Sequence, residues 1–127
     1  MSRGILDTSV LIATDVAPIP GELAISIASI AELHFGVLVA RTPQIRASRL
    51  RRLSGLQRRF DPLPVDEAVA DSYGTLAARV VEAGRQPRPR IVDLLIAATA
   101  HAHNAAVYTR NADDLAGLDD LISIVTV

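Results

Sequence analysis

Four short segments rich in Ile, Val and Leu recur along this chain, and longer amphipathic stretches separate them. The segments cover residues 4–6, 23–27, 105–109 and 122–127, and each is mostly continuous in apolarity. Continuous apolarity over so few residues is typical of strands that are covered on both faces, as in parallel sheets. The sequence therefore predicts a parallel sheet whose strands are joined by right-handed crossover helices.

Helical patterns fill the intervals between these strands. In residues 66–83, apolar side chains recur at three- and four-residue steps, Asp66 can cap the start and Gly84 marks the end. Further helices are expected at 29–40, 44–60 and 93–103. The alternation predicts an α/β fold with three layers, in which helices cover a central parallel sheet, and the length of 127 residues fits a single domain over 1–127.

The composition excludes several kinds of site. Cysteine is absent, which rules out disulfides and thiolate metal sites and suits a cytoplasmic protein. The apolar runs at 23–31 and 94–100 are much shorter than the ~20 residues that span a bilayer. Asp7 interrupts the apolar stretch at the N-terminus, so we expect neither a membrane span nor a signal peptide.

Lysine is also absent, because all 13 basic residues are arginine. Receiver domains, haloacid-dehalogenase-type phosphotransferases and P-loop nucleotide-binding proteins all depend on a lysine, so these three classes are excluded. The formal net charge of −1 conceals an uneven distribution. Residues 41–60 hold seven arginines and no acid, whereas most of the acids lie from Asp61 onward.

Acidic residues follow the predicted strands where the strands end. Asp7 follows the first strand, Asp113 and Asp114 follow the strand at 105–109 together with Asn111, and Asp93 opens an apolar helix. Because ligands of parallel α/β sheets gather beyond the carboxyl ends of the strands, these side chains are candidates for one site. Glu32, in the helix after the second strand, is expected to be mostly buried and to join them.

Each acid also has a structural interpretation. Asp7 can cap a helix that begins near Val10, Ser29 and Glu32 can form a capping box, and Asp93 and Asn111 can be N-caps. Taken together, however, these carboxylates should meet at one edge of the sheet with few cations nearby. Clustered carboxylates bind a cation or raise one another's pKa, and an all-oxygen set selects Mg²⁺ or Mn²⁺.

Three stretches carry a family resemblance: "LDTSVLI" near the start, "SIASIAELHFGVL" after it, and "DLLIAATAHAHNAAVYTRNADDLAGL" near the end. In this order they resemble PIN-domain ribonucleases, and most closely the VapC toxins of bacterial type II toxin–antitoxin systems. The resemblance covers nearly the whole chain. It implies a PIN-like α/β/α fold and a Mg²⁺-dependent endoribonuclease that cleaves cellular RNA, either transfer RNA or ribosomal RNA.

The resemblance also implies roles for particular residues. The acidic site corresponds to Asp7, Glu32, Asp93 and Asp114, with Asp7 and Asp93 binding the metal directly. The family pattern Thr-x-Asn-x-x-Asp-Phe falls on Thr109, Asn111 and Asp114, with Leu115 in place of the aromatic residue. Asp113 is an alternative to Asp114 as the fourth acid. Residues expected to act on metal-bound water or to position substrate are Thr8, Thr109, Asn111 and Asp113.

The arginine-rich segment is a candidate surface for RNA phosphates, because guanidinium groups suit such contacts. On a helical wheel, one face gathers Leu50, Leu53, Leu56 and Phe60 and the opposite face gathers arginines. The arginines expected to contact RNA are Arg51, Arg52, Arg58, Arg59, Arg88 and Arg90. The alternative is a solvated charged face without a ligand.

Partners follow from the resemblance. It implies a VapB-like antitoxin that inserts a basic side chain into the acidic pocket, a homodimer formed through apolar surface, and a toxin–antitoxin hetero-oligomer. The rival functional hypothesis is a non-catalytic PIN-like module that binds RNA or a protein and keeps its acids for stability.

Overall fold

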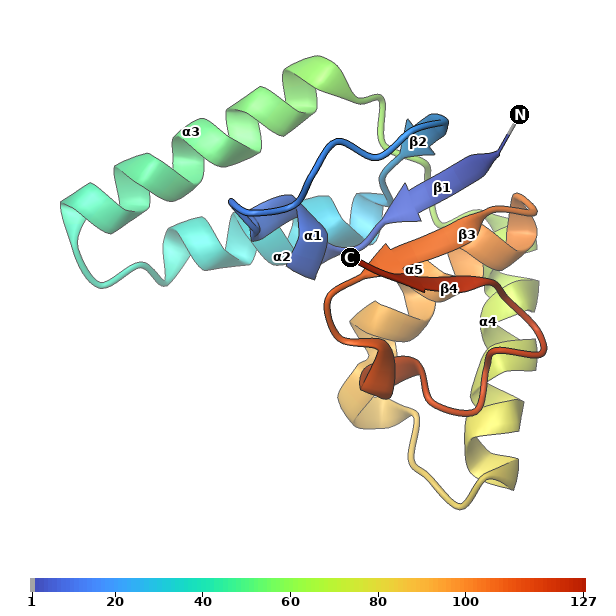
Figure 1. The fold of residues 1–127 in the computed structure, drawn as a ribbon. Coiled ribbons are helices and arrows are strands. Elements are labelled where there is room, and N and C mark those ends of the chain that lie inside the picture. Colours follow the sequence, from blue (N-terminus) through green and yellow to red (C-terminus); the bar gives the residue numbers. More distant parts are fainter. Residues whose placement is uncertain (1) are drawn as a thin grey trace.

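The centre of the fold is the pairing of β1 (Arg3–Leu6) with β3 (Ala106–Thr109), two strands from opposite ends of the chain. The computed structural model describes residues 2–127. In it, β2 (Glu22–Ala24) and β4 (Ile124–Thr126) extend the sheet on either side, in the order β2-β1-β3-β4. All neighbouring strands are parallel (Figure 1). The predicted parallel sheet is thereby confirmed.

Helices connect the strands. Their bounds are α1 (Thr8–Ile12), α2 (Ile27–Leu38), α3 (Pro43–Arg59), α4 (Glu67–Glu82) and α5 (Ile91–Ala102), with short 3-10 helices η1 (Arg88–Arg90) and η2 (Ala112–Leu115). The antiparallel pair of α2 and α3 projects from the sheet as a hairpin, and α4 packs beside α5 (Figure 1). As predicted, Asp66 caps α4 by accepting from the Val69 N–H, and Gly84 follows the helix with a φ of 78°.

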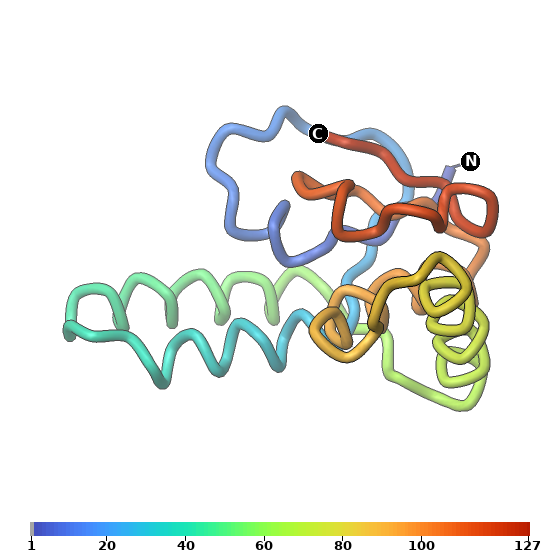
Figure 2. The backbone as a smooth tube through the Cα atoms, turned by 90° about the horizontal axis from the view of Figure 1, so that it is seen from below, coloured from blue at the N-terminus to red at the C-terminus, as the bar shows by residue number. Residues whose placement is uncertain are grey.

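The two faces of the sheet are buried by different parts of the chain. Ile5 and Val107 face a core cluster built largely from α4 and α5. Leu6, together with Val10 of α1, belongs to a smaller cluster completed by the segment 13–20. Figure 2 shows α4 and α5 on one side of the sheet and this segment on the other. The second outer layer is therefore a short helix and an extended segment.

The boundaries expected for α2 and for the second strand were wrong, for two different reasons. Helix α2 begins at Ile27, since Ser26 accepts a hydrogen bond from the Ala28 N–H and takes the N-cap position. Ser29 is consequently buried inside the helix, and the proposed capping box with Glu32 does not form. The second strand ends at Ala24, because residues 25 and 26 leave the sheet to bridge Leu63.

Among residues 2–127, no helix combines the length and apolarity needed to cross a bilayer.

Gly4 is required by the close approach of the Tyr108 ring to the backbone of β1. A Cβ atom at position 4 would overlap that ring and would lie 3.2 Å from Leu23 Cδ2. We expect Gly4→Ala to destabilise the protein by about 1–3 kcal/mol, the usual cost of overpacking. Gly74→Ala is the matched control, since its Cβ would meet nothing within 4 Å in the middle of α4. It should stabilise by about 0.5–1 kcal/mol, and urea unfolding would show both effects. Equal stability of Gly4→Ala and the parent would contradict the packing argument.

Candidate functional site

Asp7 stands where β1 becomes α1, and the residue as a whole is buried, at 8% exposure. Its backbone N–H continues the sheet pairing by donating to the Tyr108 carbonyl at 3.1 Å. Oδ1 accepts from the Val10 N–H at 3.2 Å and from Ser9 Oγ at 2.6 Å. Within residues 2–127, no buried side-chain oxygen lacks a partner, so Oδ2, which makes none of these bonds, is open to solvent. Asp7 is therefore both the predicted helix cap and a carboxylate available to a ligand.

Ser9 links the end of β1 to the end of β3 through two hydrogen bonds. Besides donating to Asp7, its hydroxyl accepts from the Arg110 N–H at 3.0 Å, just beyond β3. Thr109 Oγ1 accepts from the Asn111 N–H at 2.9 Å and fixes the same turn. Ser9 was not among the predicted site residues, although a serine two residues after an aspartate at a strand end is a common turn-forming pattern.

Asp93 lies in the first turn of α5 and is half-buried. It is not the N-cap, because η1 runs into α5 and Arg90 occupies the cap position. Burial, together with the negative charges of Asp114, Glu32 and Asp7, raises the pKa of Asp93 to about 6, and the Arg90 guanidinium opposes this rise. The other three predicted acids are thus all close enough to act on Asp93.

The turn after β3 separates Asp114 from its neighbour Asp113. Asp114 is half-buried, acts on Asp93 and has Oδ1 4.0 Å from Arg90 Nε. Asp113 is exposed and is absent from the charges that act on Asp93. The structure therefore brings Asp114 to the acidic cluster and leaves Asp113 outside it. Asn111 takes the N-cap position of η2, as expected, but without a side-chain capping bond.

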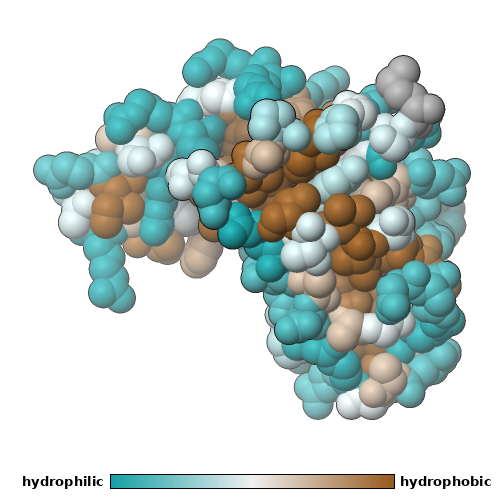
Figure 3. Space-filling view, in the orientation of Figure 1, coloured by the Kyte–Doolittle hydropathy of each residue, from teal (hydrophilic) through white to brown (hydrophobic). Residues whose placement is uncertain are grey.

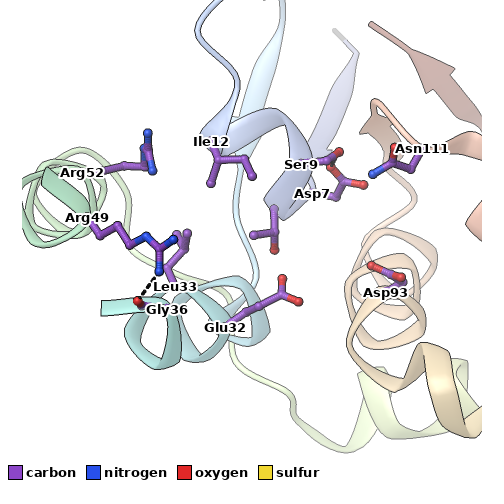
Figure 4. Close-up of a pocket in the computed structure, with 11 residues that line it drawn as sticks. Asp7, Ser9, Ile12, Glu32, Leu33, Gly36, Arg49, Arg52, Asp93 and Asn111 are labelled. Atoms are coloured by element: carbon purple, nitrogen blue, oxygen red, sulfur yellow. Dashed lines mark hydrogen bonds between the residues drawn. The ribbon is translucent and has the colours of Figure 1, made fainter. Parts of the chain in front are cut away.

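Glu32 faces the aspartates from α2 across an open pocket. The expectation that it would be mostly buried was wrong, because the side chain projects from the exposed side of α2. Thr8 lies on the same wall and donates to Ser29 Oγ at 3.1 Å. Figure 4 shows Glu32 directed toward the space between Asp7 and Asp93. The pocket has a volume of about 430 Å³, and its lining is Asp7, Thr8, Ser9, Ile12, Glu32, Leu33, Gly36, Arg49, Arg52, Asp93 and Asn111.

This donor set fits a hard divalent cation by its chemistry, since it consists of carboxylate and hydroxyl oxygens. As they stand, however, no three acidic or imidazole side chains within residues 2–127 are close enough to surround an ion. Asp7 is held by its hydrogen bonds, whereas Glu32 is exposed and carries a longer, freely rotating side chain. The structure thus places three candidate ligands, on three elements, around one pocket, and side-chain rotation would be needed for them to surround an ion.

The arginines that line the pocket are not the set that the sequence predicted to contact RNA. Arg52 lines the pocket, as does Arg49, which the sequence analysis did not select. Arg49 precedes Leu53 and Leu56 by four and seven residues, so the spacing of the buried leucines already placed it on the inner face of α3. Leu50, expected on that face, is 50% exposed.

The remaining predicted RNA-contacting arginines lie outside the lining of the pocket. Arg51, Arg58 and Arg88 are exposed, and the Arg59 guanidinium lies 5.5 Å from the centre of the Phe60 ring. Arg90 lies beside Asp114 at the edge of the acidic cluster.

A family model described as "PIN domain" matches residues 5–121 of this chain. The chain belongs to the PIN domain family. As a PIN domain, it is 42% identical over 129 residues to Ribonuclease VapC5 of Mycobacterium tuberculosis, covering 97% of the chain and 93% of that protein. It is 34% identical to Ribonuclease VapC4 of the same organism, with 98% of the chain and 97% of the relative covered. The resemblance to VapC proteins is confirmed.

Solved structures support the same fold for this PIN domain. A crystal structure of VapBC-5 from Mycobacterium tuberculosis matches with a TM-score of 0.85 and 41% identity, covering 100% of this chain and 98% of the other. FitAcB from Neisseria gonorrhoeae matches with a TM-score of 0.76 and 25% identity over 96% of each chain. The predicted PIN-like fold is therefore confirmed.

The raised pKa of Asp93 makes the stability of this PIN domain depend on pH. An aspartate that ionises at 3.8 when unfolded and at about 6 when folded costs no stability below pH 4, an increasing amount between pH 4 and 6, and the full amount above pH 6. We expect Asp93→Asn, in EDTA, to raise the melting temperature at pH 7.5 by roughly 3–5 °C. This corresponds to about 1 kcal/mol after allowance for solvent screening.

Thermal unfolding between pH 4 and 8 measures this effect, and the gain should vanish toward pH 4. Asp119→Asn, which changes an exposed aspartate outside the cluster, is the matched control and should show no such trend. An unchanged or lower melting temperature for Asp93→Asn at pH 7.5 would contradict the electrostatic account.

Proposed function

We propose that this PIN domain is a VapC-type toxin: an endoribonuclease that uses Mg²⁺, with Mn²⁺ as a substitute, to hydrolyse phosphodiester bonds of transfer RNA or ribosomal RNA. The observation that carries the proposal is the convergence of Asp7, Glu32 and Asp93 around one pocket, with Asp114 close enough to raise the pKa of Asp93 together with Asp7 and Glu32. The names of its relatives, Ribonuclease VapC5 and Ribonuclease VapC4, support the nuclease class.

The positions of the four acids suggest a different role in metal binding and proton transfer for each pair. Asp7 and Asp93, which both line the pocket from the side of the sheet, would hold the cation directly, and Glu32 and Asp114 would hold its water ligands or a second ion. When bound, the divalent cation supplies positive charge for the phosphate and lowers the pKa of a bound water. Glu32 or Asp114 would accept the proton of the attacking water while the bond from phosphorus to the leaving oxygen breaks.

Polar neighbours would position these groups. Thr8 lines the pocket and can contact water or phosphate through its hydroxyl. Thr109 is buried and acts through the turn that it holds, which orients Asn111 at the pocket wall. Asp113, exposed on the same turn, is left with at most a peripheral role in positioning substrate.

Arginines would bind the RNA backbone around this centre. Arg52 lines the pocket, and Arg90 lies beside Asp114 at the edge of the acidic cluster. Exposed guanidinium groups further from the acids would add contacts that do not depend on RNA sequence, and they come from Arg51, Arg58, Arg59 and Arg88.

We further propose a VapB-type antitoxin as partner, with a basic side chain of the antitoxin entering the acidic pocket. The structural relatives include VapBC-5 from Mycobacterium tuberculosis, a member of a toxin–antitoxin family, and a DNA-bound VapBC from Salmonella typhimurium. Apolar side chains are available for such contacts and for a homodimer, since Phe35 and Leu38 are 66% and 63% exposed on α2. Figure 3 shows hydrophobic groups both near the sheet and along the α2–α3 hairpin.

The test is cleavage of a panel of structured RNAs, with transfer RNA and ribosomal fragments included, by purified protein in Mg²⁺ or Mn²⁺. We expect cutting at defined sites that EDTA abolishes. Asp7→Asn should reduce the rate by about 10²- to 10⁴-fold, because it removes a charged ligand of the reacting centre. Asp119→Asn, an equivalent change on the surface, should cut at the parental rate.

Equal cutting by the parent and Asp7→Asn would mean that a contaminant is responsible. If neither cuts but Mg²⁺ raises the melting temperature of the parent, the metal site is supported and the substrate lies outside the panel. If Mg²⁺ changes neither cleavage nor melting temperature, the proposal fails in favour of a non-catalytic binding module. The absence of a closed three-ligand cluster among residues 2–127 is the observation that favours this second candidate.

A further inference from the structure

The wall of the pocket opposite the acids is cationic. Arg49 and Arg52 project from α3 toward the pocket, three residues apart and therefore on neighbouring parts of one helix face (Figure 4). No carboxylate among residues 2–127 forms a salt bridge with either guanidinium. Helix α3 itself contains no acidic residue. Two positive charges thus line an acidic pocket without being neutralised by the protein.

Arg49 is held in place by a bond that leaves its charge intact. Its Nη1 donates to the Gly36 carbonyl at 2.7 Å. Gly36 lies in the last turn of α2, where carbonyl groups lack partners within the helix, so this bond caps α2 and anchors α3 to it. Because a carbonyl is neutral, the guanidinium remains a fixed positive charge at the pocket wall.

The space between the arginines and the acids is partly apolar. Ile12, 46% exposed, and Leu33 line it together with Gly36. In Figure 4, Arg49 and Arg52 lie at one end, Ile12 and Leu33 beside them, Glu32 next, and Asp7, Asp93 and Asn111 at the other end. The pocket is therefore cationic at one end, apolar in the middle and acidic at the other end.

We propose that Arg49 and Arg52 form a subsite for a phosphodiester group adjacent to the scissile one on an unpaired RNA strand. The arginines bind the flanking phosphate, and Ile12 and Leu33 contact the intervening sugar or base. In an RNA strand, less polar sugar and base units separate one phosphate from the next. This order matches the arginines, the apolar side chains and a metal-loaded acidic end, and an acidic peptide lacks it. The inference rests on the proposed ribonuclease function and deepens it by assigning where the strand lies relative to the acids.

This subsite discriminates by charge and shape and carries no base-reading group. Arginine contacts to phosphate fix the register of a strand, whereas aliphatic contacts accept any base. The subsite therefore positions the cut relative to a bound phosphate, and specificity for particular bases must arise elsewhere in the complex.

The experiment measures binding of a fluorescein-labelled, single-stranded RNA 12-mer of mixed sequence by fluorescence anisotropy in EDTA, where metal-dependent cleavage stops. Arg52→Gln is the main variant, because Arg52, unlike Arg49, makes no capping bond whose loss would disturb the α2–α3 hairpin. Arg46→Gln is the matched control, since it removes the same charge from an exposed position of α3 that does not line the pocket.

We expect Arg52→Gln to raise Kd roughly three- to tenfold relative to Arg46→Gln. The slope of log K against log salt should fall in magnitude by about 0.7, the value for one phosphate contact on a single strand. Arg52→Lys, which keeps the charge, should restore most of the salt slope. In cleavage assays, Arg52→Gln should raise KM and leave kcat within about twofold, because the subsite contacts no reacting atom.

Equal Kd and salt slope for Arg52→Gln and Arg46→Gln would overturn the subsite and leave this wall to an acidic protein partner. That outcome is distinguishable from failure of the proposed function. A parent protein that never cuts RNA, yet binds the 12-mer more tightly than Arg52→Gln does, would refute the nuclease and retain the phosphate subsite.

Discussion

The functional site depends on the parallel pairing of β1 with β3. This pairing places the end of the first strand beside the end of a strand from the last quarter of the chain, and the Asp7 N–H continues it by bonding to the Tyr108 carbonyl. Ser9 then links the Asp7 carboxylate to the backbone beyond β3. These bonds fix the position of Asp7 relative to the turn that carries Asp114.

The second constraint is the repulsion among the clustered carboxylates, which face arginines across the pocket. Burial at the start of α5 raises the pKa of Asp93, and acids at the end of β1, on α2 and in the turn after β3 add to this effect. The protein tolerates this cost in a pocket whose opposite wall carries Arg49 and Arg52. A divalent cation bound by the acids would neutralise one wall, and RNA phosphates bound by the arginines would neutralise the other. The metal site and the RNA-binding surface would then belong to one pocket.

Prediction from the sequence succeeded where a single local pattern determined the structure. Continuous apolar strands ended by aspartates predicted β1, β3 and the position of Asp7. Prediction failed where two local signals competed, since Ser26 rather than Ser29 caps α2 and η1 moved the start of α5 ahead of Asp93. It also failed where tertiary packing decided, because the exposure of Glu32 depends on how α2 packs against the rest of the chain. Arg49 was missed although its spacing from Leu53 and Leu56 placed it on the inner face of α3.

The most direct test of the central claim, that these carboxylates form a metal site, is anomalous diffraction from crystals soaked in Mn²⁺. The account predicts an anomalous peak between the carboxylates of Asp7 and Asp93, with Glu32 rotated toward it and Asp114 nearby. Absence of a peak there at saturating Mn²⁺, or a peak bound by other residues, would contradict it.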